Sequence, residues 1–249
     1  MTKSTVKFVI VGTQRTGTTL IRTSLSSHPD IHCAGEAFLL GKRPYRQADG
    51  YWHYSRQSLS RRIKSLILPK LSAAAYLDEL YFDGDFAASG FKLMLSHCKA
   101  RPYLWPLLKE HNVKAILVRR VNPIKTLVSR RTAAKSGVYH VSGSHKATTI
   151  RIDTESLVAD LDEIENEAPT WRKKLGDATE YLDIAYEDYL LDQPGTNEKI
   201  LDFLGVPQAI LTSKLKKINP DDLRMLIENF EEFATALENT KYAAYLDPK

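Results

Sequence analysis

The stretch from Lys7 to Thr19 constrains the fold more than any other part of the 249-residue chain. Its first residues, up to Val11, form a short apolar, β-branched run, which predicts a buried first strand. From Thr18 onward the apolar residues recur at helical spacing. Gly12 and Gly17 bracket polar residues between the two and suit a tight loop. A strand, a glycine-bounded loop and a helix N-terminus together predict a site that binds an anion.

The bulk composition indicates a soluble globular protein, with 43% hydrophobic and 26% charged residues. No apolar run is long enough to cross a membrane, although a peripheral position at a membrane stays open. The first residues lead directly into the strand, so we expect no signal peptide. Cys33 and Cys98 form no CxxC pair and need no bridge. These features fit a reducing compartment, and we expect a cytoplasmic protein.

The net charge of +5 is unevenly distributed. Residues 101–135 contain nine Lys or Arg and one acid, which suits a surface that faces an anionic ligand. Residues 153–188 contain twelve acids and three Lys or Arg, as expected of a solvated helix face. The positive balance is weak evidence for nucleic acid, and we expect no nucleic-acid partner.

Predicted strands and helices alternate along the chain. Further strands are expected at 31–34, 89–95, 113–118 and 181–186, with helices at 71–82, 102–111, 123–135, 154–175, 197–204 and 221–237. This order predicts an α/β fold with three αβα layers around a central parallel sheet. Such sheets bind ligands beyond the carboxyl ends of their strands, where Gly12, Glu36 and Arg120 are all expected. We expect one domain over residues 1–249, with a substrate-binding excursion around 41–85.

The spacing Gly12-x-x-x-x-Gly17 matches the opening of a P-loop, which continues with Lys and then Ser or Thr. Here Thr18 and Thr19 follow instead, and the basic residue, Arg15, lies inside the loop. The strongest later strand ends in two arginines rather than in an acid that would hold magnesium. The loop therefore favours an anion bound without a metal. A magnesium-dependent P-loop kinase and a non-catalytic nucleotide-binding protein stay open as alternatives.

Two motifs make the assignment more specific. The loop QRTGTT resembles the 5′-phosphosulfate loop of sulfotransferases that use PAPS (3′-phosphoadenosine 5′-phosphosulfate). The stretch LVRRVNPIKTLVS resembles their 3′-phosphate motif, in which an Arg at a strand end precedes a Ser by about nine residues, here Arg120 and Ser129. Both side chains can reach one phosphate if the Ser lies about two turns into the helix. Further stretches (HPDIHCAGEAF, GFKLM, YEDYL, LDFLGVP) match in order. The resemblance is closest to bacterial carbohydrate sulfotransferases of the nodulation-factor and trehalose type.

The resemblance implies a P-loop-NTPase-like sulfotransferase fold, PAPS as the sulfuryl donor and no metal. Glu36 would act as general base toward the acceptor hydroxyl, and Arg15 would stabilise charge on the bridging oxygen. Arg120 and Ser129 would hold the 3′-phosphate. The 5′-phosphosulfate would be bound by Gln14, Arg15, Thr16, Gly17, Thr18 and Thr19. Arg15 stands where some sulfotransferases have Lys.

The acceptor implied by the resemblance is a carbohydrate or a glycolipid. The aromatic stretch from Tyr45 to Tyr54 is a hypothetical platform for stacking on sugar rings. Lys92 is the one charge in a predicted apolar strand, and it either lines the site or extends its ammonium group to solvent. Lys217 is a second lysine that could approach the nucleotide. His28 and His32 have only superficial metal-ligand spacing, because no third ligand is evident.

Overall fold

The computed structural model describes residues 5–39, 50–82, 85–137, 148–215, 220 and 222–246. Within these residues the strands form one sheet in the order β2-β3-β1-β4-β5. They are β1 (Val6–Gly12), β2 (Ile31–Ala34), β3 (Ala88–Met94), β4 (Lys114–Arg119) and β5 (Tyr181–Ala185). Every neighbouring pair is parallel, which confirms the predicted α/β fold with a central parallel sheet.

The register brings the carboxyl ends of the strands to one edge of the sheet. Gly12, the last residue of β1, lies opposite Met94 of β3 and Val118 of β4. Arg119 at the end of β4 lies opposite Ala185 at the end of β5. The segments that follow the five strands therefore leave the sheet on the same side, where a ligand site of an open α/β sheet is expected.

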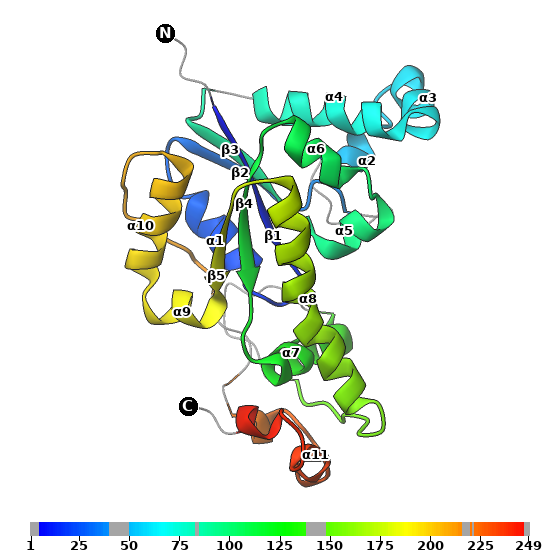
Figure 1. Cartoon of the computed structure of the whole chain (residues 1–249), viewed down its shortest axis with the longest axis vertical. Helices are drawn as coiled ribbons and strands as arrows, with labels where there is room; N and C mark the ends of the chain where they lie inside the picture. The colour runs from blue at the N-terminus through cyan, green and yellow to red at the C-terminus, as the bar shows by residue number, and fades with distance from the viewer. Residues whose placement is uncertain are drawn as a thin grey trace.

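Helices cover both faces of the sheet (Figure 1). The helices are α1 (Thr18–Leu25), α2 (Tyr51–Tyr54), α3 (Leu59–Ile67), α4 (Pro69–Phe82), α5 (Leu95–Ala100), α6 (Leu104–Glu110), α7 (Pro123–Ser136), α8 (Leu157–Ala178), α9 (Tyr186–Leu191), α10 (Gln193–Leu204) and α11 (Phe230–Leu237). Within the described part of the chain, no helix combines the length and the apolar character needed to cross a membrane.

The central strand β1 illustrates why two layers of helices form. Its side chains alternate between the two faces of the sheet, as strand geometry requires. Val9 and Val11 belong to the core cluster that includes residues of α4, α6 and α8. Phe8 and Ile10 belong to the cluster on the other face, with residues of α1, α9 and α10. A strand that is apolar on both sides is therefore buried on both sides.

A third apolar cluster lies beyond the carboxyl edge of the sheet. It joins α7 to the first turns of α8 and to α11, through residues such as Leu127, Leu161 and Phe233. In Figure 1, α7 and α11 lie below the end of β4, away from the two main layers. This cluster supports the side of the candidate site that α7 provides.

The predicted helix over 221–237 is wrong as a single element. The structure has a short 3-10 turn at Leu223–Met225, a parallel bridge from Ile227 to Ile150, and then α11. Asn229 explains the interruption, because its side-chain oxygen accepts from the Ile152 amide and its nitrogen donates to the Ile152 carbonyl. These contacts hold Asn229 in a non-helical conformation just before α11.

Candidate active site

The loop between β1 and α1 adopts a conformation that its glycines permit. Gly17 has φ 92° and Arg15 has φ 68°, both in the left-handed region. A Cβ on Gly17 would lie 2.3 Å from the ring of Tyr186, so only glycine fits against this ring. Gly17 caps α1 without a side-chain hydrogen bond. The amides of the first turn of such a helix suit an anion.

The threonines of the loop have different roles. Thr16 and Thr18 are buried, and the Thr16 hydroxyl donates to the Thr13 carbonyl at 3.0 Å. The Thr16 hydroxyl therefore holds the loop together, which leaves its amide as the group to face a ligand. Thr19, one residue into the helix, accepts a hydrogen bond on its hydroxyl oxygen from Lys92 at 3.0 Å. Gln14 is exposed at the tip of the loop.

Lys92 connects this loop to Glu36. It lies on β3 and is almost fully buried, with 6% of its surface exposed. Its ammonium group donates to Glu36 Oε1 at 2.9 Å as well as to Thr19. A buried lysine requires such partners, because an isolated charge in the core is strongly unfavourable. Of the two sequence-based interpretations of Lys92, the structure therefore favours a position in the site.

His97, in α5, contacts the other oxygen of Glu36. Its Nε2 lies 3.6 Å from Glu36 Oε2, and its Nδ1 accepts from the Met94 amide at 3.3 Å. Since an amide can only donate, Nδ1 has no proton in this arrangement. The proton of the neutral ring is then on Nε2, directed at the carboxylate. His97 was not predicted from the sequence, although it follows a strand end just as Glu36 does.

These two neighbours determine the protonation state of Glu36. Burial of the carboxyl group opposes its charge and would raise its pKa. The hydrogen bond from His97, together with the charge and hydrogen bond of Lys92, outweighs burial and lowers the pKa of Glu36 to about 2. The group is therefore a carboxylate at neutral pH and can accept a proton.

The arginines predicted to hold the donor lie around the loop. Arg15 Nε donates to the Ser129 hydroxyl at 2.9 Å, so a loop residue meets a residue of α7. The Arg120 guanidinium lies 5.3 Å from the centre of the Tyr186 ring, which covers Gly17. Arg120 also donates to the Lys125 carbonyl at 3.2 Å. Arg120 and Ser129 are thus linked to the same loop through Tyr186 and Arg15.

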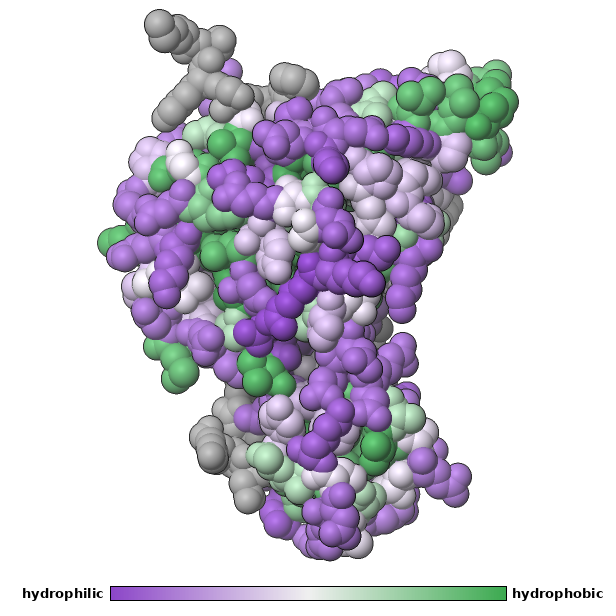
Figure 2. All heavy atoms as spheres, viewed as in Figure 1, coloured by the Kyte–Doolittle hydropathy of each residue, from purple (hydrophilic) through white to green (hydrophobic). Residues whose placement is uncertain are grey.

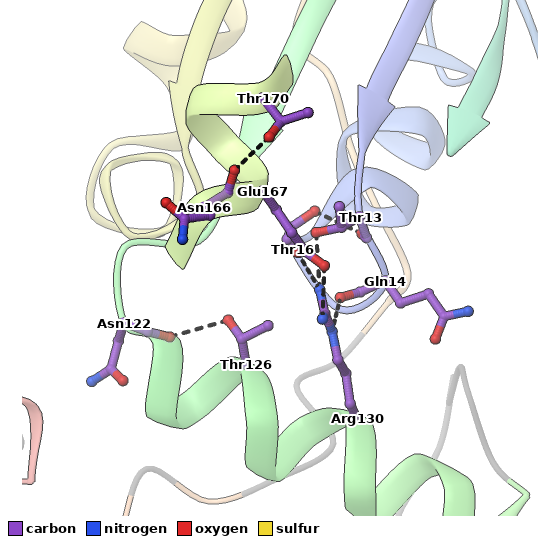
Figure 3. A network of polar contacts seen from close by, with 9 residues as sticks. All are labelled: Thr13, Gln14, Thr16, Asn122, Thr126, Arg130, Asn166, Glu167 and Thr170. Carbon is purple, nitrogen blue, oxygen red and sulfur yellow. Dashed lines mark hydrogen bonds and ion pairs between the residues drawn. The ribbon is translucent and has the colours of Figure 1, made fainter. Parts of the chain in front are cut away.

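Arg130, which the sequence analysis did not select, fixes the loop to two helices (Figure 3). It extends from α7 and donates to the Gln14 carbonyl at 3.1 Å and to the Thr13 hydroxyl at 3.0 Å. The same guanidinium forms a two-pronged ion pair with Glu167 of α8, at 3.0 and 2.6 Å. Its only signal in the sequence was its place next to Ser129.

Other charged or aromatic side chains near the site have structural roles. Arg119 pairs with Asp183 at 2.7 Å, as expected for a residue on the opposite face from Arg120. Glu187 accepts from the amides of Val121 and Asn122. Tyr51 and Tyr54 are buried against Phe38 and Tyr76, so their rings are no open platform for a sugar. Residues 45–49 of that stretch and Lys217 lie outside the described residues.

The histidines near α1 are also structural. His28 bonds the Pro207 carbonyl through Nε2, and its Nδ1 accepts from the Asp30 amide. His32 packs against Phe86. Among the residues that the structure describes, no group of three metal-binding side chains comes together.

The parallel sheet, the glycine-bounded loop and the surrounding cations define an α/β protein with a candidate anion site at the carboxyl edge of its sheet. Residues 8–209, most of the chain, match the model of the sulfotransferase family. The chain therefore belongs to the sulfotransferase family and is a transferase.

Solved structures resemble the chain at low identity. A sulfotransferase from Alicyclobacillus acidocaldarius is 19% identical, with a TM-score of 0.50 over 98% of this chain and 94% of that one. The sulfotransferase domain from the curacin biosynthetic pathway is 16% identical, with a TM-score of 0.46 over 98% and 84%. Sulfotransferase STF1 from Mycobacterium tuberculosis H37Rv is 16% identical, with a TM-score of 0.45 over 83% and 69%. A search among curated proteins finds no match.

Proposed function

We propose that this protein transfers the sulfuryl group of PAPS to a hydroxyl of a carbohydrate or glycolipid acceptor. The observation that carries the proposal is the position of Lys92. It bonds both Glu36 and Thr19, which lies at the start of α1 just after the Gly12–Gly17 loop, here called the anion loop. A cation shared by an anion site and a carboxylate suits a reaction in which a hydroxyl attacks a bound anionic group. The kind of acceptor, and closeness to the nodulation-factor and trehalose type, rest on the resemblance in the sequence motifs.

The residues around the loop suit a nucleotide that carries phosphates at both the 3′ and the 5′ position of its ribose. The first turn of α1, from Gly17 to Thr19, would bind the 5′-phosphosulfate, together with Gln14 and Arg15. Arg120 and Ser129 would bind the 3′-phosphate. A guanidinium and a hydroxyl are suitable partners for a phosphate dianion. Such a site needs no metal, because arginine, lysine and amides supply the positive potential.

Glu36 would accept the proton of the acceptor hydroxyl. The new bond joins the acceptor oxygen to sulfur, and the bond from sulfur to the bridging oxygen of the 5′-phosphate breaks. Arg15 and Lys92 would stabilise the charge that develops on that oxygen, with 3′,5′-ADP as the product. A general base typically contributes about 10²–10⁴-fold in rate. One well-placed donor contributes about 10²–10³-fold.

The shared position of Lys92 also suggests how donor binding would activate Glu36. A carboxylate with a pKa of about 2 is ionised but weakly basic. An anion at the loop would compete with Glu36 for the Lys92 ammonium. The pKa of Glu36 would then rise, and the residue would become a stronger base in the donor complex.

The proposal places this chemistry in one domain over residues 1–249, with residues 41–85 contributing to acceptor binding, in the cytoplasm. It is tested by measuring 3′,5′-ADP release from PAPS in the presence of a panel of sugars and glycolipids. We expect release that depends on an acceptor and falls at least about 10²-fold in Glu36→Gln. A kinase would consume ATP with magnesium instead, and a non-catalytic binding protein would give equal, background release in both proteins.

A further inference from the structure

The helix α3 presents its apolar face to solvent. Leu59, Ile63, Leu66 and Ile67 are 73%, 47%, 75% and 71% exposed, and no residue of this helix is buried. Figure 2 shows hydrophobic side chains gathered at the corner of the molecule where α3 lies in Figure 1. Residues at these spacings share one side of a helix. In a globular protein that side normally faces the core.

The polar side of α3 faces the protein instead. Arg61 and Ser65, one turn apart, are the two least exposed residues of the helix. Arg61 bonds Glu79 of α4 at 2.8 Å and lies 4.2 Å from the centre of the Tyr54 ring. The helix is thus held by polar contacts with its apolar face outward. The polar contacts of α3 therefore leave its apolar face exposed.

The patch extends into α4 through Leu68 and Leu71, which are 49% and 55% exposed. Half of the twelve large hydrophobic residues exposed in the described part of the chain lie within residues 59–71. Exposed apolar residues are normal when scattered but mark a contact site when they are contiguous. Residues 59–71 therefore form one apolar surface, which we call the α3 patch.

The charges around the α3 patch indicate what it contacts. Residues 50–77 contain five Lys or Arg and no acid. Arg62 and Lys64 lie on either side of the apolar stripe, and neither forms an ion pair with a described residue. A helix with an apolar face bordered by Lys and Arg has the character of interfacial helices that bind anionic lipid.

We propose that the α3 patch docks on an anionic membrane surface. Leu59, Ile63, Leu66 and Ile67 would enter the region below the headgroups, and Arg62 and Lys64 would meet lipid phosphates. Self-association suits the patch less well, because a two-fold axis would bring Arg62 and Lys64 of the two copies together, and residues 59–71 contain no acid. The proposal does not depend on which group the enzyme transfers.

Binding to vesicles tests the proposal. Wild-type protein is sedimented with vesicles of phosphatidylcholine alone and of phosphatidylcholine mixed with phosphatidylglycerol. We expect binding to the mixed vesicles that weakens as salt is raised. Leu66→Gln with Ile67→Gln should reduce the partition coefficient at least about tenfold, since two apolar side chains no longer insert. Glutamine keeps the helix propensity of this segment.

Leu191→Gln with Ile210→Gln is the matched control, because these residues are 87% and 94% exposed elsewhere on the surface. The control should bind like wild type, and thermal melting should show all variants folded. Arg62→Glu with Lys64→Glu should remove the preference for phosphatidylglycerol. The proposal is overturned if wild type ignores the mixed vesicles or if the α3 variant binds as well as wild type. If wild type forms a dimer and does not bind vesicles, and the α3 variant is a monomer, the α3 patch is instead the contact surface for a second copy of the chain.

Discussion

Lys92 and Glu36 are 56 residues apart in the chain, yet the ammonium group of one lies 2.9 Å from the carboxylate of the other. The parallel sheet produces this pair, because β2 and β3 are neighbours and Ala34 lies opposite Phe91. Lys92 follows in β3, and Glu36 lies just past the end of β2. The same ammonium group bonds Thr19 at the start of α1. Sheet register thus places a buried cation between the carboxylate and the anion loop.

Lys92→Met should lower turnover by about 10²–10³-fold, because it keeps the apolar stem and removes the donor shared by loop and carboxylate. Lys114→Met is the matched control. Lys114 is also a strand lysine, but its ammonium group bonds the Phe203 carbonyl at the other end of the sheet. Steady-state rates of 3′,5′-ADP release should separate the two variants. Equal rates in Lys92→Met and Lys114→Met would give Lys92 a structural role only.

Acid should destabilise the protein through Glu36. Its pKa is lowered from 4.5 to about 2 in the folded protein, so the ionised group stabilises the fold above about pH 4.5. That contribution is lost as pH falls from about 4.5 to about 2. Urea unfolding at several pH values should therefore show wild type and Glu36→Gln converging in stability as pH falls through this window. A difference in stability between wild type and Glu36→Gln that stays constant over this pH range would show that ionised Glu36 does not stabilise the fold.

Gly17→Ala should weaken both folding and binding. A methyl group there meets the Tyr186 ring at 2.3 Å and also requires a left-handed backbone. We expect a loss of about 2–4 kcal/mol in unfolding free energy. Gly137→Ala has the same backbone constraint, at φ 69°, but meets nothing within 4 Å, and should lose only about 1 kcal/mol. Equal losses in chemical denaturation would show that the contact with Tyr186 is unimportant.

Arg130→Met should loosen the anion loop. It removes the contacts to Thr13 and Gln14 and leaves Glu167 without its ion-pair partner. We expect about 1–3 kcal/mol less stability and weaker 3′,5′-ADP binding, measured by calorimetry. Arg131→Met also breaks a bond to α8, through Asp160, but this pair is more exposed and does not touch the loop. Its effect should stay below about 1 kcal/mol, with unchanged affinity. If Arg130→Met binds 3′,5′-ADP as tightly as wild type does, the contacts of Arg130 with the loop do not contribute to nucleotide binding.

Local patterns in the sequence predict much of this fold. The strand over Ile31–Ala34 and the helix closed by Gly137 match the structure because short apolar runs and left-handed caps are local signals. Contacts between distant residues are harder to predict. The bridge from Ile150 to Ile227 divides the last predicted helix, and nothing in the spacing of residues 221–237 indicates it.

The residues of the candidate site also differ in whether a local sequence pattern marks them. Glu36, Arg120 and Ser129 could be selected because they follow strands or match a motif. His97 also follows a strand, but no motif marks it or Arg130, because their importance lies in partners far along the chain, Glu36 and Glu167. The α3 helix was missed for another reason. The excursion around residues 41–85 was expected to contain a helix only at 71–82, yet α3 forms at Leu59–Ile67 with a clear apolar face.

PAPS as the donor requires that Arg120 and Ser129 recognise a second phosphate on the nucleotide. Thermal melting with 3′,5′-ADP, 5′-AMP and ATP with magnesium tests it directly, because a ligand that binds the folded state raises the melting temperature. We expect the largest shift with 3′,5′-ADP. Arg120→Ala should abolish this preference, because it lowers the affinity for 3′,5′-ADP by about 10–100-fold while binding of 5′-AMP stays nearly unchanged. Arg119→Ala, which loses the pair with Asp183, should keep the preference. Equal shifts with 3′,5′-ADP and 5′-AMP in wild type, or a larger shift with ATP and magnesium, would show that the protein has no site for a 3′-phosphate.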